Sequence, residues 1–332
     1  MRDLRPALHR VSWTWAALLF AATFLATTVV GARLAYNFHL GRPSYVSNTD
    51  LFPFAWVWHH PATWLGGLSF SLPLLAILLA HELGHYLACR HYGLDSTLPI
   101  FLPAPTLIGT IGAFIRIKSA FFERCELFDV GIAGPLAGMI LTLPLLTFGL
   151  ATSHVLTPAQ LPFWRHQYFE FGWPPLAQWI EHGLRPGTSI AQLSISPVAR
   201  AAWVGLLLTM LNLVPGAQLD GGHILYAASP TLHRIASWGA MLLMIFAGWR
   251  FWPGWFVFAG FIALMRVRHP PVPKVQPLGK ARAALALLAL AVFALTFMLT
   301  PLAPRQGPAV PNFAGLRADF AHRAKRRDPR ER

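Results

Sequence analysis

The chain has 332 residues, of which 55% are hydrophobic and 12% are charged, and its formal net charge is +14. Soluble domains carry about 25% charged residues, so this composition excludes an ordinary soluble protein and predicts an integral, multi-pass protein of the lipid bilayer. Much of the positive charge lies at 266–282 and 317–332. Basic residues beside membrane spans are typical of membrane orientation and anionic lipid, so no nucleic-acid partner is expected.

Apolar stretches long enough to cross a bilayer recur along the chain. We predict spans at residues 11–31, 65–90, 128–150, 198–214, 232–249, 251–265 and 281–299. The fifth and sixth spans form a hairpin folded at Trp252-Pro253-Gly254, and six spans remain if that hairpin is shallow. The predicted fold class is therefore an all-α polytopic membrane protein with six to seven transmembrane helices.

The second predicted span contains the sequence HELGH at 81–85. His81 and His85 lie one helical turn apart on one face, with Glu82 beside them. Two histidines at this spacing suit a zinc ion, and a glutamate in the same turn can accept a proton from a water that the zinc acidifies. Chance would give such a motif in only about one chain of this composition in a hundred.

Ionisable residues at membrane depth argue against a purely structural role for this motif. Each costs about 2.5–3.5 kcal/mol on insertion scales, whereas zinc binding contributes on the order of 10–16 kcal/mol in small structural zinc peptides. A bound metal would therefore offset the cost of burying Glu82 and an acidic third ligand. The sequence predicts a Zn²⁺ site within the second span, about 14 Å from the membrane surface at Arg90.

Residues 98–118 are apolar but do not fit a helix. Prolines at 99, 103 and 105 break helical structure, and residues 113–118 alternate with the period of two that is typical of a strand. A strand at membrane depth is tolerated only where protein buries it or where it lines a watery cavity. We therefore predict a re-entrant, β-like segment near the metal site.

The third predicted span contains the sequence AGPLAG, in which Gly134 and Gly138 are four residues apart. Small residues at this spacing allow two helices to pack closely. Close packing is the simpler interpretation of these glycines, and support of the metal site is the alternative. Residues 152–195 form a predicted loop that is too short for a typical domain.

A third metal ligand is expected near the broken end of the fourth span. Asp220 is the best candidate because it lies at the same predicted depth as His85, and the glycines after it let the backbone approach closely. His223 and Cys89 are the competing candidates. A fourth protein ligand, such as Cys89, would close the site and make it structural.

The distribution of Lys and Arg predicts the orientation of the chain. With the N-terminus in the cytoplasm, thirteen basic residues outside the C-terminal tail fall on the inner side and six on the outer side, which satisfies the positive-inside rule. This orientation places the metal site nearer the cytoplasmic face, and the expected location is the bacterial inner membrane. Residues 1–300 are expected to form one transmembrane domain with its core at about 65–226, and residues 301–332 a basic, disordered tail.

Three short blocks resemble the site-2 protease family of intramembrane zinc metalloproteases. They are HELGH at 81–85, NLVP at 212–215 and LDGGH at 219–223. The segments GTIGAFIRIKS and FDVGIAGPLAG are similar to the same family, most of all to bacterial and chloroplast members without a PDZ domain. The similarity covers about 74–145 and 203–226.

The resemblance implies a role for each residue of the site. His81, His85 and Asp220 would be the zinc ligands, Glu82 the general base, and Asn212 a residue that holds the substrate or its oxyanion. Family members with a PDZ domain carry it between the third and fourth of these spans, where the present loop is too short for one.

The predicted function is therefore that of a zinc metalloendopeptidase that cleaves single-span or multi-span membrane proteins within the bilayer. Two alternatives come from other classes of protein. One is a zinc-stabilised, non-proteolytic membrane protein. The other is a metal transporter, which would need several ionisable residues along a path, and the remaining spans offer few. The sequence predicts neither the substrate nor the oligomeric state.

Overall fold

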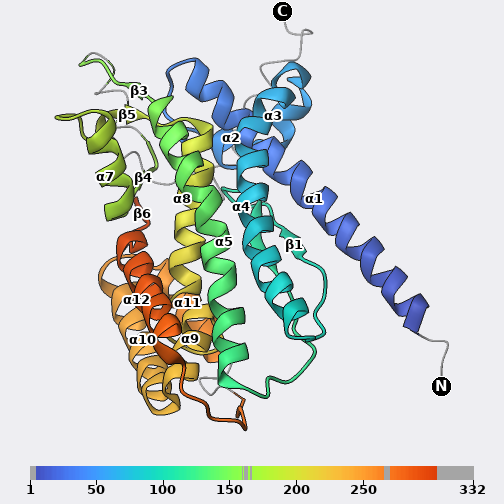
Figure 1. The fold of residues 1–332 in the computed structure, drawn as a ribbon. Helices are drawn as coiled ribbons and strands as arrows, with labels where there is room; N and C mark the ends of the chain where they lie inside the picture. Colours follow the sequence, from blue (N-terminus) through green and yellow to red (C-terminus); the bar gives the residue numbers. More distant parts are fainter. Residues whose placement is uncertain (1–4, 159, 161–163, 165–166, 265–269, 305–332) are drawn as a thin grey trace, which may run out of the picture.

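The computed structural model describes residues 5–158, 160, 164, 167–264 and 270–304, and these residues are mostly helical (Figure 1). The longer helices are α1 (Arg5–His39), α4 (Trp64–His91), α5 (Arg124–Ala151), α8 (Pro197–Asn212), α10 (Pro230–Arg250) and α12 (Gly279–Thr296). The shorter helices are α2 (Asn48–Leu51), α3 (Phe54–Trp58), α7 (Pro175–Leu184), α9 (Asp220–Ala228) and α11 (Gly254–Leu264). The strands are β1 (Ile100–Pro103), β2 (Thr110–Phe114), β3 (His154–Val155), β4 (Phe169–Phe171), β5 (Leu193–Ser194) and β6 (Leu302–Pro304).

Four helices of the described chain are long and apolar enough to cross a membrane, namely α1, α4, α5 and α12. α8 and α11 are apolar but shorter. The structure thus supports a multi-pass helical membrane protein, while the count of six to seven spans stays a prediction. The last residue of the predicted span at 251–265 lies outside the described residues.

α1 extends eight residues beyond the predicted end of its apolar stretch at residue 31. A buried carboxylate stabilises this extension. Asp50, which is 3% exposed, accepts hydrogen bonds from Arg33 Nε at 2.6 Å and from Asn37 Nδ2 at 2.8 Å. These tertiary contacts keep the polar end of α1 helical, and hydropathy alone does not reveal them.

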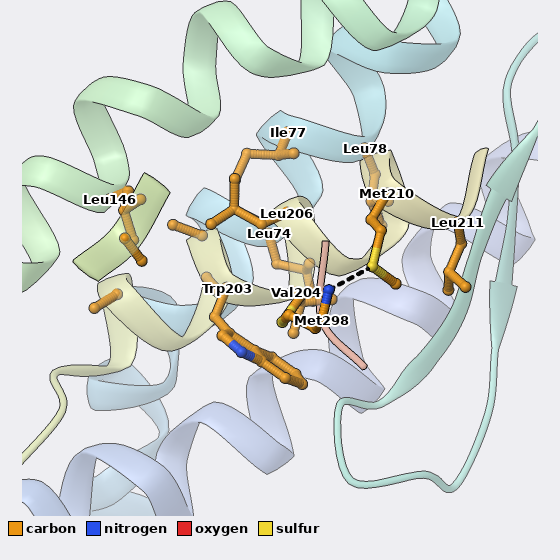
Figure 2. Packing of buried hydrophobic residues seen from close by; sticks show 14 of the residues in the cluster. Leu74, Ile77, Leu78, Leu146, Trp203, Val204, Leu206, Met210, Leu211 and Met298 are labelled. Atoms are coloured by element: carbon orange, nitrogen blue, oxygen red, sulfur yellow. Dashed lines mark hydrogen bonds between the residues drawn. The ribbon is translucent and has the colours of Figure 1, made fainter. Parts of the chain in front are cut away.

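α4, α5 and α8 form the centre of the helical bundle, and Figure 2 shows the apolar side chains that fill it. Leu74 and Ile77 of α4 and Trp203 and Leu206 of α8 belong to this one buried cluster. Complete burial of one such side chain stabilises the fold by about 1.5–3 kcal/mol. Three parts of the chain that are distant in sequence are therefore held in fixed positions beside one another.

The chain that follows α12 also enters this core. The backbone amide of Met298 donates a hydrogen bond to Met210 Sδ at 3.0 Å (Figure 2). At the other end of α12, Arg282 donates to Asp129 of α5 through Nε at 2.8 Å and Nη2 at 2.6 Å. The Tyr92 hydroxyl, just after α4, donates to the same carboxylate. The last candidate span is thus fixed to the first turns of α5.

β1 and β2 form a hairpin in the segment predicted to be β-like. Their antiparallel register pairs Ile100 with Phe114, and the register shifts near Pro103. β2 covers 110–114 instead of the alternating residues 113–118, and an isolated bridge between Ser96 and Ile117 continues the pairing. The hairpin packs on α1, where the rings of Phe20 and Phe101 are 5.0 Å apart.

The predicted loop at 152–195 contains α7 and short strands. α7 begins at Pro175, a residue favoured in the first turn of a helix. After α7, Arg185 forms an ion pair with Glu181 and donates to the carbonyl groups of Leu150, Ala151 and Ser153 at the end of α5. These long-range bonds order a stretch that the sequence alone describes as irregular.

The predicted disordered tail differs from the structure in its first residues. Leu302–Pro304 is strand β6, which pairs with β4. Residues 305–332 lie outside the described residues.

Candidate metal centre

The two motif histidines occupy one face of α4 and are both buried, each 7% exposed. Their Nε2 atoms are 3.2 Å apart. His85 Nδ1 donates a hydrogen bond to the Val130 carbonyl of α5 at 2.7 Å. Because a carbonyl can only accept, the proton lies on Nδ1 and leaves the Nε2 lone pair free to bind a metal.

Asp220 is the first residue of α9, and its carboxylate faces both imidazoles. Oδ2 is 3.2 Å from His81 Nε2, and Oδ1 is 3.3 Å from His85 Nε2. His81, His85 and Asp220 each offer one ligand atom, and these atoms all lie within 4.8 Å of one another. Residues that are 135 positions apart in the chain thus converge on one point.

The spacing of these atoms fits a metal ion. Zinc binds nitrogen and oxygen ligands at about 2.0–2.2 Å in a tetrahedron, which places the ligand atoms about 3.3–3.5 Å apart. The two Nε2 atoms are 3.2 Å apart, and each lies 3.2–3.3 Å from a different oxygen of the Asp220 carboxylate. With one ligand atom from each residue, the three atoms lie within 4.8 Å of one another. Asp220 Oδ2 is also buried with no hydrogen-bond partner among the described residues. Three protein ligands leave a fourth position for water or substrate, as in catalytic zinc sites.

α5 packs against this site through its small residues. A Cβ atom added at Gly134 would lie only 2.1 Å from His85 Nε2, whereas one added at Gly138 would be 3.4 Å from the nearest atoms of His81. Gly134 is therefore necessary for the imidazole to occupy its present position. The sequence AGPLAG had two interpretations, helix packing and support of the metal site. Both apply to Gly134.

Glu82 lies beside the ligand group without belonging to it. The residue is 5% exposed, and its carboxylate lies next to His81 and His85 and within hydrogen-bonding reach of the Ile115 backbone amide. Ile115 immediately follows β2. The Glu82 carboxylate thus interacts both with the two motif histidines and with the residue that follows the hairpin strand.

The other predicted site residues take different positions. Asn212 ends α8, and its Nδ2 lies 3.2 Å from His81 Nε2. His223 and Cys89 are not part of the converging ligand group among the described residues. The His223 ring faces Phe121, and Cys89 is buried in an apolar cluster with Leu94.

Two contacts of the site come from backbone groups, which the sequence does not reveal. They are the Val130 carbonyl, which orients His85, and the Ile115 amide, which faces Glu82. A backbone group has no signature in residue type. The segment that contains Ile115 is marked in the sequence by the alternation at 113–118 and by its similarity to the site-2 protease family, but neither identifies the Ile115 amide.

Comparison with known proteins gives a consistent result. The sequence model of peptidase family M50 matches residues 69–247. The chain is 38% identical over 164 residues to probable zinc metalloprotease EGY2, a chloroplastic protein of Oryza sativa subsp. indica, which covers 48% of this chain and 29% of that protein. The Arabidopsis thaliana protein of the same name is 34% identical over 164 residues, or 48% of this chain and 28% of that protein.

A longer match extends beyond this central region. Probable zinc metalloprotease EGY3 of Oryza sativa subsp. indica, also chloroplastic, is 25% identical over 313 residues, which is 89% of this chain and 50% of that protein. The matches thus span between 28% and 50% of the length of these relatives.

Proposed function

The chain belongs to peptidase family M50, and from this membership we propose that it is an intramembrane zinc metalloendopeptidase, which hydrolyses peptide bonds of transmembrane substrates. The observation that carries the proposal is the convergence of His81, His85 and Asp220 within 4.8 Å, with Glu82 beside them. These residues lie on or next to apolar helices of membrane-spanning length. The expected process is regulated intramembrane proteolysis.

His81, His85 and Asp220 would hold the zinc ion. When bound, zinc supplies Lewis-acid chemistry by polarising the scissile carbonyl and lowering the pKa of the attacking water. Glu82 accepts the proton that the water loses as its oxygen attacks the carbonyl carbon, and then delivers it to the amine nitrogen as the peptide bond breaks. Asn212 is suited to donate a hydrogen bond to the developing oxyanion from the end of α8.

A transmembrane helix satisfies its peptide groups internally, so it must become extended before it can be cleaved. β2 supports a way of holding the extended substrate. Its sheet contains only β1 and β2 among the described residues, so one edge of β2 has no partner strand there and could pair with a substrate by β-augmentation. The Ile115 amide links the end of that edge to Glu82, and a substrate strand paired there would approach the catalytic carboxylate.

We further propose the finer topology that the sequence predicts. α8, α10 and α11 would complete the six to seven spans, and the β1–β2 hairpin would be re-entrant. The proposed location is the bacterial inner membrane, and the distribution of Lys and Arg favours an orientation with the site nearer the cytoplasmic face. The catalytic domain would cover 1–300, followed by the basic tail.

The test is cleavage by the purified full chain in lipid vesicles. The substrates are single-span proteins, some with a Gly-Pro pair in the span so that helix unwinding does not limit the reaction. We expect wild-type protein to cleave, and Glu82→Gln to keep zinc but lose activity by a factor of about 10²–10⁴. Leu87→Ala, on an exposed face of the same helix, serves as the control and should cleave normally.

Two results would contradict the proposal. One is undiminished cleavage by Glu82→Gln. The other is a wild-type protein that holds zinc and cleaves none of the panel, including the Gly-Pro substrates, and this result favours the zinc-stabilised, non-proteolytic alternative.

A further inference from the structure

A tight loop joins two of the candidate site residues. It runs from Asn212, the last residue of α8, to Asp220, the first residue of α9. Within it Ala217 has a φ of +52°, the one positive value of a non-glycine residue in the described chain. An L-residue in the left-handed region is strained and persists only where surrounding contacts hold it there. The contacts that hold Ala217 therefore determine how the loop reaches Asp220.

α10 supplies those contacts on both sides of Ala217. The Ala217 amide donates a hydrogen bond to Ser237 Oγ at 3.0 Å, and His233 Nε2 donates to the Ala217 carbonyl at 2.8 Å. Ser237 Oγ is oriented in turn, because it donates to the His233 carbonyl at 2.7 Å. His233 is 2% exposed and Ser237 is fully buried. Both polar groups of one strained residue are thus bonded to a single helix.

The loop transmits this position to the first turn of α9. The Leu219 amide donates to the Gly216 carbonyl at 3.3 Å. A Cβ atom at Gly222 would lie 2.6 Å from the carbonyl oxygens of both Gly216 and Ala217. The first turn of α9, which carries Asp220, therefore rests directly on the backbone that α10 holds.

We propose that His233 and Ser237 are positioning residues for Asp220, fixing the carboxylate against the two imidazoles through Ala217. This inference rests on the proposed metal site. Neither residue is in the ligand group, and each acts by holding the backbone of the loop. α10 thereby becomes part of the machinery of the site although it contributes no ligand.

The experiment is a double-mutant cycle on zinc affinity in the full chain, measured by competition with a zinc chelator and without substrate. We expect His233→Ala to weaken zinc binding about tenfold. This is the lower end of the roughly 10–100-fold loss that follows removal of a group that orients a metal ligand. His233→Gln should restore most of the affinity because its amide can donate to the Ala217 carbonyl. In Asp220→Ala protein, adding His233→Ala should produce no further loss. Leu242→Ala, on an exposed part of α10, is the matched control.

A second pair of variants tests the same mechanism where His233→Ala fails to fold. Ser237→Ala should also weaken zinc binding, and Ala217→Gly in that background should recover part of the affinity because glycine adopts a positive φ without strain. The inference would be overturned if His233→Ala reduced zinc affinity equally with and without Asp220. It would also be overturned if Ser237→Ala reduced zinc affinity and Ala217→Gly recovered none of the loss.

The outcome is separable from that of the proposed function. An Asp220→Ala protein with unchanged zinc affinity overturns both the ligand assignment and this inference. If His233→Ala weakens zinc binding only in protein that retains Asp220, and the vesicle assay shows no proteolysis, the positioning role is supported and only the protease is contradicted.

Discussion

The metal centre depends on the position of one imidazole ring. His85 donates from Nδ1 to the Val130 carbonyl, and its Nε2 faces a helix surface without a side chain at Gly134. The first contact sets the tautomer, and the second leaves room for the ring. Both contacts come from α5, so the candidate ligand on α4 is fixed by its neighbouring helix.

Replacement of Gly134 by Ala should displace that ring. The added Cβ would lie 2.1 Å from His85 Nε2, a distance that requires the imidazole or the helix to move. We expect zinc affinity, measured by chelator competition, to fall at least about tenfold. Cleavage of the single-span substrates should fall in parallel. Gly138→Ala on the same helix is the control, since its Cβ would meet His81 at an ordinary contact distance of 3.4 Å. Equal affinities of the two variants would contradict this account.

The sequence was most informative about the site where side-chain type carries the chemistry. HELGH and the aspartate of LDGGH indicated the residues that converge in the structure. It was least informative about contacts made by backbone groups, such as the Val130 carbonyl, and by residues distant in the chain, such as His233. A histidine on an apolar helix has no pattern that distinguishes a hydrogen-bond donor to a loop from a ligand.

At the scale of elements, apolar length predicts the helices well and their ends less well. α4 was predicted at 65–90 and covers Trp64–His91, because the apolar run and the helix coincide. α1 was predicted to stop at residue 31 but continues to His39, because Asp50 binds its polar end. α7 was missed because proline and aromatic residues obscured a helix that tertiary bonds to Arg185 stabilise.

The β1–β2 hairpin gives a prediction at this scale. Ile111→Pro or Ala113→Pro removes a backbone donor from β2, so substrate pairing should weaken and kcat/KM should fall about tenfold for the loss of one or two hydrogen bonds. Zinc content should stay unchanged. The assay is cleavage of the single-span panel alongside zinc analysis.

A proline elsewhere tests whether the effect is specific to the strand. Val275 is exposed in an irregular stretch, and Val275→Pro should leave cleavage normal. If both β2 variants also cleave normally, the strand edge does not hold the substrate.

At the scale of the whole molecule, the candidate ligands come from two regions, α4 and the start of α9. A metal bound there would cross-link those regions in the folded state only. Binding to the native state stabilises it by about 2.7 kcal/mol when the free ligand is a hundred times its Kd. Such a contribution is large beside the usual margin of protein stability.

Metal removal should therefore lower the thermal stability of the wild-type chain in detergent micelles. We expect a chelator to reduce Tm in wild-type protein and to have little further effect on Asp220→Ala, whose Tm should already be lower. Restoration of Tm by added Zn²⁺ is the control for reversibility. A chelator that shifts both proteins equally would indicate that the metal contributes from another site.

The edge of β2 that pairs with no strand of the described chain has a consequence for selectivity if it holds the substrate. Strand pairing recognises peptide N–H and C=O groups, which every residue carries, so the edge discriminates weakly between one sequence and another. Choice among membrane proteins would then depend on how readily each helix gives up its own hydrogen bonds near the catalytic depth. Spans weakened by glycine, proline or asparagine would be cut, and uniformly leucine-rich spans would be spared.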